Sequence, residues 1–132
     1  MNVEKTLAAC RAEYERQMAM EKAATPGPWH VGGMFNPDSP TPTQNVWSKP
    51  DPGKHSGFVI ASYCSPGNAR LVEASRNLNP ARLKIVGKFL ASIGGWVDSL
   101  HAADEEVDTD DTESWGWQLT SAAVLLGVEV VE

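Results

Sequence analysis

The stretch that decides the fold is residues 79–102, NPARLKIVGKFLASIGGWVDSLHA. Its apolar residues alternate at spacings of three and four, the period of one helix face: Leu83, Val86, Leu90, Ile93, Val97 and Leu100. Asn79 and Pro80 are a typical N-cap and first helical residue, so the pattern predicts a helix from 80 to about 102. Gly94 and Gly95 each cost about 1 kcal/mol relative to alanine, which favours a kink or the close approach of another backbone.

A shorter helix and three strands are predicted before this segment. Residues 67–78 fit a helix capped by Asn68, with three residues on one face: Leu71, Ser75 and Leu78. The strands are runs of β-forming residues bounded by Gly, Pro and Asn, at 29–35, 45–48 and 58–64. Gly32 and Gly33 indicate a bulge in the first strand. The connections between the strands favour an antiparallel meander.

An N-terminal helix is predicted over residues 3–24, where apolar residues form a narrow stripe: Val3, Leu7, Cys10, Tyr14 and Met18. The segment Thr25-Pro26-Gly27-Pro28 ends it, because neither proline continues a helix. Such a stripe either docks onto the protein's own sheet, which is the usual case, or pairs with a second copy. A homodimer through the N-terminal helix is therefore the alternative expectation.

The C-terminal quarter contains an acidic loop at 104–113, then a predicted helix from 114 to 126 and an edge strand at 128–131. The whole pattern predicts a single α+β domain over residues 1–132. A small antiparallel sheet of about three strands would pack with the N-terminal helix and two to three C-terminal helices. A chain of 132 residues with 42% hydrophobic and 21% charged residues has the composition of an ordinary globular domain.

Composition also indicates the cellular compartment in which the protein is expected. Two cysteines, Cys10 and Cys64, cannot form a disulfide framework. No apolar run approaches the ~18 residues that span a bilayer. Residues 1–17 carry charges every few positions and lack the apolar segment of a signal peptide. We therefore expect a cytoplasmic protein without a membrane partner.

The charge is unevenly distributed along the chain. Residues 1–100 hold all 11 basic residues, whereas residues 101–132 hold nine acidic ones and no basic one. The acidic loop is either a solubilising connection or a patch that meets a basic partner surface. Trp115 and Trp117 cannot share a helix face, so one of them is expected to be exposed as a partner contact. The candidate partner-binding residues are Asp104, Glu105, Glu106, Asp108, Asp110, Asp111, Trp115 and Trp117.

Basic residues gather before and within the long helix, which is unfavourable near a helix N-terminus: Arg70, Arg76, Arg82, Lys84 and Lys88. They indicate an anionic partner. The favoured one is the protein's own acidic segment, a pairing that would leave no nucleic-acid footprint. The alternative is a small anionic ligand, such as a nucleotide, bound by Lys54, His55, Arg70, Arg76 and Arg82.

Two further clusters have little local support as chemical sites. Cys64 with His30 or His55 would make a nucleophile and its base, but Cys64 ends an apolar strand, where a small buried residue is ordinary. Asp98, His101 and Glu105 could face one metal ion on a helix, but the helix is near its end there. The sequence therefore predicts no catalytic residue, no metal and no cofactor.

Two segments resemble a group of small bacteriophage and prophage proteins. They are Ala24 to Val31, ATPGPWHV, and Asn68 to Ser75, NARLVEAS, which are similar to that group's "TPGPW" entry and "NARLIAAA"-like helix. The resemblance covers about half the chain and excludes the acidic C-terminal region, and the group is largely without assigned activity. It implies an accessory phage protein in the cytoplasm of an infected bacterium. Phage proteins of this size are often non-enzymatic inhibitors of a host or defence component, including anti-CRISPR proteins.

Overall fold

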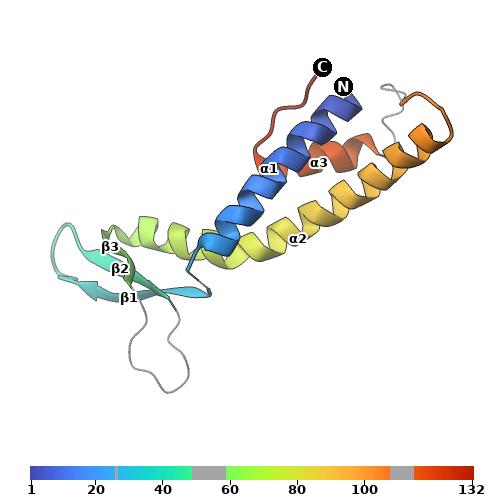
Figure 1. Cartoon of the computed structure of the whole chain (residues 1–132). Coiled ribbons are helices and arrows are strands. Elements are labelled where there is room, and N and C mark those ends of the chain that lie inside the picture. Colours follow the sequence, from blue (N-terminus) through green and yellow to red (C-terminus); the bar gives the residue numbers. More distant parts are fainter. Residues whose placement is uncertain (26, 49–58, 108–114) are drawn as a thin grey trace. The chain divides into compact units, whose positions relative to one another are not determined.

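The computed structural model describes residues 1–25, 27–48, 59–107 and 115–132. Its elements follow in the order α1 (Val3–Ala23), β1 (Trp29–Phe35), β2 (Thr43–Ser48), β3 (Val59–Cys64), α2 (Pro66–Ala102) and α3 (Gly116–Leu126) (Figure 1). An N-terminal helix, a three-stranded antiparallel sheet and two C-terminal helices confirm the predicted α+β class.

The chain divides into two compact units, which are described separately. Unit 1 contains residues 1–22 and 81–132, and unit 2 contains residues 23–80. Helices are the only regular elements in the described part of unit 1, whereas unit 2 contains the sheet and the first turns of α2.

Helix α2 is one helix of 37 residues, not the two that the sequence predicts. It begins one residue after Ser65, whose Oγ accepts a hydrogen bond from the Asn68 backbone N–H at 3.4 Å. Ser65 and Pro66 thus provide the N-cap and first helical residue, and Asn68 lies inside the helix. Asn79 and Pro80 carry the same local signal, but the helix continues through them.

Because α2 is one helix, the prediction that its basic residues lie near a helix N-terminus is wrong for three of them. Arg82, Lys84 and Lys88 lie in the middle of the helix rather than in its first two turns. The dipole of a helix acts within its terminal turns. The penalty expected for three cations at a helix N-terminus therefore does not apply to them.

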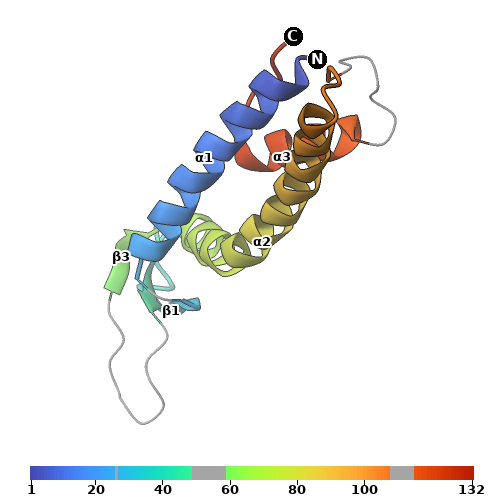
Figure 2. The ribbon, with the colours of Figure 1, turned by 45° about the vertical axis from the view of Figure 1, so that its right-hand side comes forward.

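The core of unit 1 forms where α1, the C-terminal half of α2 and α3 meet (Figures 1 and 2). The N-terminal part of the α1 stripe is buried there, while Met18 at its other end is 42% exposed. The stripe therefore docks onto helices, and the expectation that it docks onto the sheet is wrong. The buried residues of this cluster are Val3, Leu7, Cys10, Leu83, Val86, Leu90, Ile93, Val97, Leu119, Ala122, Ala123 and Leu126.

Two glycines of α2 face side chains of α1. A Cβ at Gly94 would overlap the Arg11 guanidinium, and a Cβ at Gly87 would lie 2.7 Å from the Tyr14 hydroxyl. Of the two alternatives expected at Gly94, a kink or the close approach of another backbone, the second is wrong, because the close neighbour is a side chain. Gly95 has no atom within 4 Å of its Cβ position.

The C-terminal tail does not form the predicted edge strand. Helix α3 ends at Gly127, whose φ of 72° is the left-handed conformation that favours glycine. Val131 then accepts a hydrogen bond from the Asn2 N–H at 2.7 Å and donates its own N–H to Thr6 Oγ1 at 3.0 Å. The described part of unit 1 contains no strand with which this tail could pair, so its backbone bonds go to the start of α1 instead.

The sheet of unit 2 is the predicted antiparallel meander in the order β1-β2-β3. The register between β1 and β2 shifts between Val31 and Met34, which confirms the bulge at the two glycines. Gly32 lies against the Trp47 ring, since a Cβ there would lie 2.7 Å from the indole Nε1. Strand β2 begins at Thr43, two residues earlier than predicted.

Polar side chains of α2 attach to the outer edge of β1. Asn77 Oδ1 accepts the Trp29 N–H at 2.9 Å, and Asn77 Nδ2 donates to the Trp29 carbonyl at 3.0 Å. Glu73 Oε2 accepts the Val31 N–H at 2.6 Å. These bonds satisfy backbone groups that an edge strand would otherwise leave unpaired.

Candidate functional site

The described part of the acidic loop begins at the C-terminus of α2. The Asp104 N–H donates to the His101 carbonyl at 3.1 Å, and the Glu105 N–H donates to the Leu100 carbonyl at 2.9 Å. With Asp104 at a φ of 57°, this is a Schellman cap in which Asp occupies the position that glycine usually takes. Asp104 therefore has a structural role as well as an exposed carboxylate.

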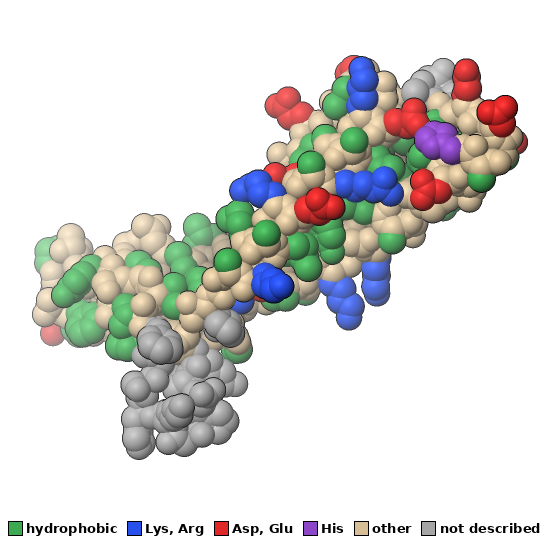
Figure 3. All heavy atoms as spheres, in the orientation of Figure 1, with side chains coloured by type: hydrophobic (Ala, Val, Ile, Leu, Met, Phe, Trp, Pro, Cys, Tyr) green, Lys and Arg blue, Asp and Glu red, His purple; other side chains and the backbone are tan. Residues whose placement is uncertain are grey.

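Asp104, Glu105 and Glu106 form an exposed acidic stretch at this helix end (Figure 3). Carboxylates are disfavoured at a helix C-terminus, where the dipole favours cations by about 0.3–1 kcal/mol each. Helix stability therefore does not explain three successive acids at this position. The other three predicted acidic contacts, Asp108, Asp110 and Asp111, lie outside the described residues.

The two tryptophans of the predicted site differ in exposure. Trp115 is half-buried and stacks on Trp96, with ring centroids 5.5 Å apart and planes at 12°. Trp117 is 55% exposed and meets Phe89 edge-on, with centroids 5.7 Å apart. The prediction that one of the pair is exposed is confirmed, and the exposed one is Trp117.

Helix α3 presents an uncharged outer surface around Trp117. Val124 lies seven residues further along the same side of the helix and is 73% exposed, and Leu125 is 38% exposed. No charged residue occurs between Gly116 and Leu126. Exposed apolar residues with a tryptophan and without charges are typical of the centre of a protein–protein interface. We call Trp117, Val124 and Leu125 the α3 face.

Two of the three arginines of the predicted anion site have structural roles, one in each unit. In unit 2, Arg76 donates from Nε and Nη2 to the Thr25 carbonyl at 3.4 and 3.3 Å and lies 5.5 Å from the Trp29 ring centroid. In unit 1, Arg82 donates to the Leu125 carbonyl and to Gln17 Oε1. Arg70 is exposed on α2, and the other two predicted ligands, Lys54 and His55, lie outside the described residues.

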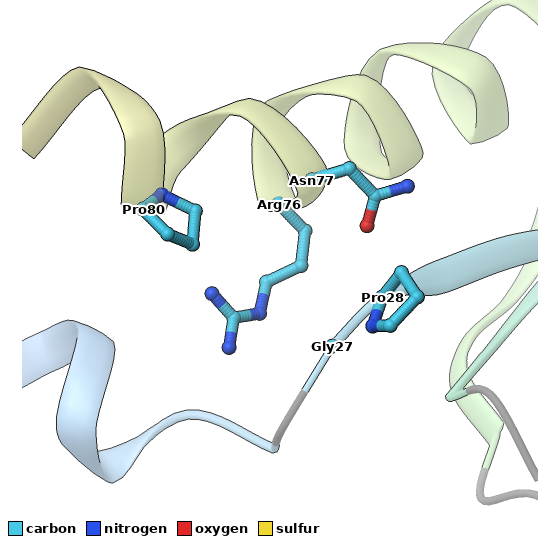
Figure 4. Close-up of a pocket in the computed structure, with 5 residues that line it drawn as sticks. All are labelled: Gly27, Pro28, Arg76, Asn77 and Pro80. Atoms are coloured by element: carbon cyan, nitrogen blue, oxygen red, sulfur yellow. The ribbon is translucent and has the colours of Figure 1, made fainter.

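Unit 2 contains a pocket of about 370 Å³ that the sequence did not predict. It is lined by Gly27 and Pro28, from the segment before β1, and by Arg76, Asn77 and Pro80 of α2 (Figure 4). Arg76 is the charged group of its lining and could attract a small anion. The sequence signals were the Pro-Gly-Pro segment and Arg76, but nothing in the sequence showed that the two lie together.

The two other candidate chemical sites, at Cys64 and at His101, have contacts that their predicted roles do not include. His101 Nε2 lies 2.6 Å from Glu4 Oε1 on α1, so its near partner is neither Asp98 nor Glu105. Within the described part of the chain, no three His, Cys, Asp or Glu side chains are placed to hold a metal ion. Cys64 Sγ contacts the Ser62 carbonyl at 3.9 Å, and burial raises the pKa of the Cys10 thiol.

Among residues 1–25, 27–48, 59–107 and 115–132, no helix is both long enough and apolar enough to cross a bilayer. No known protein family, curated protein or solved structure matches the chain. The function therefore has to be inferred from the residues themselves.

Proposed function

We propose that this chain is a non-enzymatic binding protein that inhibits a bacterial host or defence component, of the anti-CRISPR or another counter-defence type. It would act in the cytoplasm of a phage-infected bacterium. The observation that carries the proposal is the α3 face, where an exposed tryptophan lies on a helix surface without charges. A tryptophan that is exposed in the free protein and becomes buried in a complex often contributes much of the binding energy of the interface.

The acidic stretch supports the same proposal. The Trp96–Trp115 stack joins the start of α3 to α2 two turns before α2 ends, so the acids that follow α2 lie at the same end of that helix. An acidic stretch toward the start of α3 and an apolar surface along α3 fit a partner that has an apolar site with a cationic region at one end of it. The charges would speed association and set its orientation, and the apolar contact would supply most of the affinity.

The experiment is affinity capture from a bacterial lysate, identification of the bound protein and an assay of its activity. Trp117→Ala should weaken the binding at least about 30-fold, as expected for an interface anchor. Ile85→Ala is the matched control, because Ile85 is 48% exposed on α2 and belongs to neither proposed contact. Equal binding by the Trp117 variant and the wild type would remove the α3 face from the proposal.

The contribution of the acidic stretch is tested separately with Glu105→Gln and Glu106→Gln together, which keep side-chain size and remove two charges. Asp104 is left unchanged because it caps α2. Binding should weaken mainly through a slower association rate, with a smaller difference at high salt. Glu15→Gln, an exposed change on α1, should leave the rate unchanged. A rate that is equal in all three proteins would exclude this role for the acids.

A second candidate function, binding of a small anionic ligand such as a nucleotide, is favoured by the pocket beside Arg76. Nucleotides and inorganic phosphate would be tested for a rise in melting temperature, which follows mass action for a ligand that binds the native state. No shift at saturating concentrations would exclude the ligands tested. The two candidate functions are thus distinguished by whether the chain captures a protein from the lysate or is stabilised by a small anion.

We also propose self-association through α1, limited to the C-terminal end of that helix. The N-terminal part of its stripe is buried in unit 1, so a second copy would have to contact the other end of the helix. Met18 and Met20 are exposed there. Loss of self-association in the variant Met18→Glu/Met20→Glu would support this arrangement.

A further inference from the structure

The pocket of unit 2 combines an apolar lining with a single positive charge. Gly27 and Pro28 line it from the segment before β1, and Pro80 lines it from α2. The Arg76 side chain extends from α2 between the two proline rings (Figure 4). Among the lining residues that the structure describes, Arg76 is the only charged one, so no carboxylate of this lining would repel an anion.

The guanidinium of Arg76 is held in a fixed position beside the pocket. The Thr25 carbonyl that accepts its Nε–H and Nη2–H also accepts the Trp29 indole N–H at 3.1 Å. The Trp29 ring, 5.5 Å away, adds a cation–π contact. Both partners are neutral, so these contacts orient the guanidinium without cancelling its charge. Binding of an anion therefore does not require a flexible arginine to become ordered.

The volume and charge of the pocket limit the ligand to a small molecule with one negative charge. Its volume of about 370 Å³ is near the lower end of the range for small-molecule sites, roughly 300–1,000 Å³. One cation balances one anionic group, whereas further phosphates of a nucleotide would have no cation among the described lining residues. Glu73, the nearest acid along α2, accepts the Val31 N–H and does not line the pocket.

A carboxylate attached to an apolar ring fits both parts of this lining. A guanidinium binds a carboxylate through short, charge-assisted hydrogen bonds in a matched planar geometry. The ring of such a molecule would remove the apolar surfaces of Pro28 and Pro80 from water, which favours binding. Inorganic phosphate has no apolar part with which to contact these two rings.

We propose that this pocket binds a small monocarboxylate with an aromatic or aliphatic ring, whose carboxylate contacts the Arg76 guanidinium and whose ring lies between Pro28 and Pro80. The inference rests on the second candidate function, the binding of a small anion. It narrows the ligand of that function from nucleotides to ring monocarboxylates, and it is independent of the α3 face.

The first test compares benzoate with two probes that each lack one of its features, using the full chain. Benzamide keeps the ring but is neutral, and acetate keeps the carboxylate without a ring. Benzoate should raise the melting temperature with increasing concentration, and both other probes should bind at least about 10-fold more weakly. The proposal would be overturned if benzoate, phenylacetate and cyclohexanecarboxylate all gave no shift, or if acetate or benzamide bound as tightly as benzoate.

Inorganic phosphate and nucleotides, measured in the same way, separate this inference from the function on which it rests. A rise in melting temperature with these anions and none with the carboxylates would support an anion site and refute the ring monocarboxylate. A rise with benzoate alone would support both the site and its narrower ligand class. No rise with any of these compounds would refute both.

Substitutions test whether benzoate binds in this pocket. Arg76→Gln should weaken binding at least about 10-fold, the loss expected for hydrogen bonds to a charged group, whereas Arg70→Gln, an exposed change on the same helix, should bind like the wild type. Because Arg76 also contacts Thr25 and Trp29, Pro80→Ala is a second variant. Alanine is the better helix former, so circular dichroism should show an intact fold, while loss of the ring should weaken binding at least about fourfold. Unchanged binding in either pocket variant would overturn the assignment.

Discussion

Arg82 Nη1 donates to the carbonyl oxygen of Leu125 at 2.5 Å, which joins the middle of α2 to the last turn of α3. The last carbonyls of a helix have no partner within it, and a cation is favoured there. Gln17 completes the arrangement, because it accepts a bond from Arg82 Nη2 at 2.7 Å and donates to the Leu126 carbonyl at 3.0 Å. One guanidinium and one amide thus cap α3 and tie the three helices of unit 1.

We therefore expect Arg82→Ala to destabilise unit 1 by about 1.5–3 kcal/mol, the range for lost hydrogen bonds to a charged group. Urea unfolding monitored by tryptophan fluorescence would measure this free energy. Arg70→Ala, at an exposed position of the same helix, should change stability by less than about 0.5 kcal/mol. Equal effects of the two changes would contradict the capping role of Arg82.

The glycines of α2 should respond oppositely to alanine. Gly95→Ala should stabilise the protein by about 0.5–1 kcal/mol, because alanine is the better helix former and its Cβ meets no atom within 4 Å. Gly87→Ala should gain nothing or destabilise, because its Cβ would lie 2.7 Å from the Tyr14 hydroxyl. Thermal unfolding of both variants distinguishes these outcomes. If Gly87→Ala is also stabilising, the contact between Tyr14 and α2 is looser than described.

Glu13 should give the protein an acid-sensitive contribution to stability. Hydrogen bonds from Arg16 and then from Gln17 lower the pKa of the Glu13 carboxyl from 4.5 to about 2. Because the folded pKa is the lower one, the contribution is complete above pH 4.5 and is lost as the pH falls toward 2. NMR titration of the carboxyl carbon would locate the midpoint. Glu13→Gln should unfold with a weaker dependence on pH in this window, and a midpoint near 4.5 would refute the assignment.

Asn77 should be required for the attachment of α2 to β1. Asn77→Ala removes both bonds to Trp29 and leaves the backbone of the edge strand unpaired there, so it should destabilise unit 2 by about 1–2 kcal/mol. Hydrogen exchange of the Trp29 amide would report the change locally, with faster exchange expected. The exposed change Asn68→Ala, in the first turns of the same helix, is the control and should leave that amide protected.

The sequence predicted the class of the fold and most elements because local chemistry decides them. The β-forming runs and the two glycines predicted the meander and its bulge, and the apolar period of residues 83–100 predicted the helix. Asn79 and Pro80 misled because a proline carries the same signal at a helix start and inside a helix that tertiary contacts hold together.

The candidate site was less predictable, because periodicity shows that residues share a face without showing what that face meets. Leu71 and Leu78 share a face as predicted, yet this face is exposed while polar residues meet the strands. For Trp115 and Trp117, the spacing indicated that one is exposed, but only the stacking on Trp96 showed which. The pocket beside Arg76 joins segments almost fifty residues apart, which no local pattern predicts.

The pairing of Val131 with Asn2 and Thr6 has a consequence for the order in which the chain can fold. Helix α1 is synthesised before its partners, because its buried residues Val3, Leu7 and Cys10 meet residues that come only after residue 80. Until those residues are made, the nascent chain must carry an uncovered apolar stripe, and the closing bonds to Val131 form only after that residue has been added. Unit 2 is made from one continuous stretch, so it can form its hairpins before the partners of α1 have been synthesised.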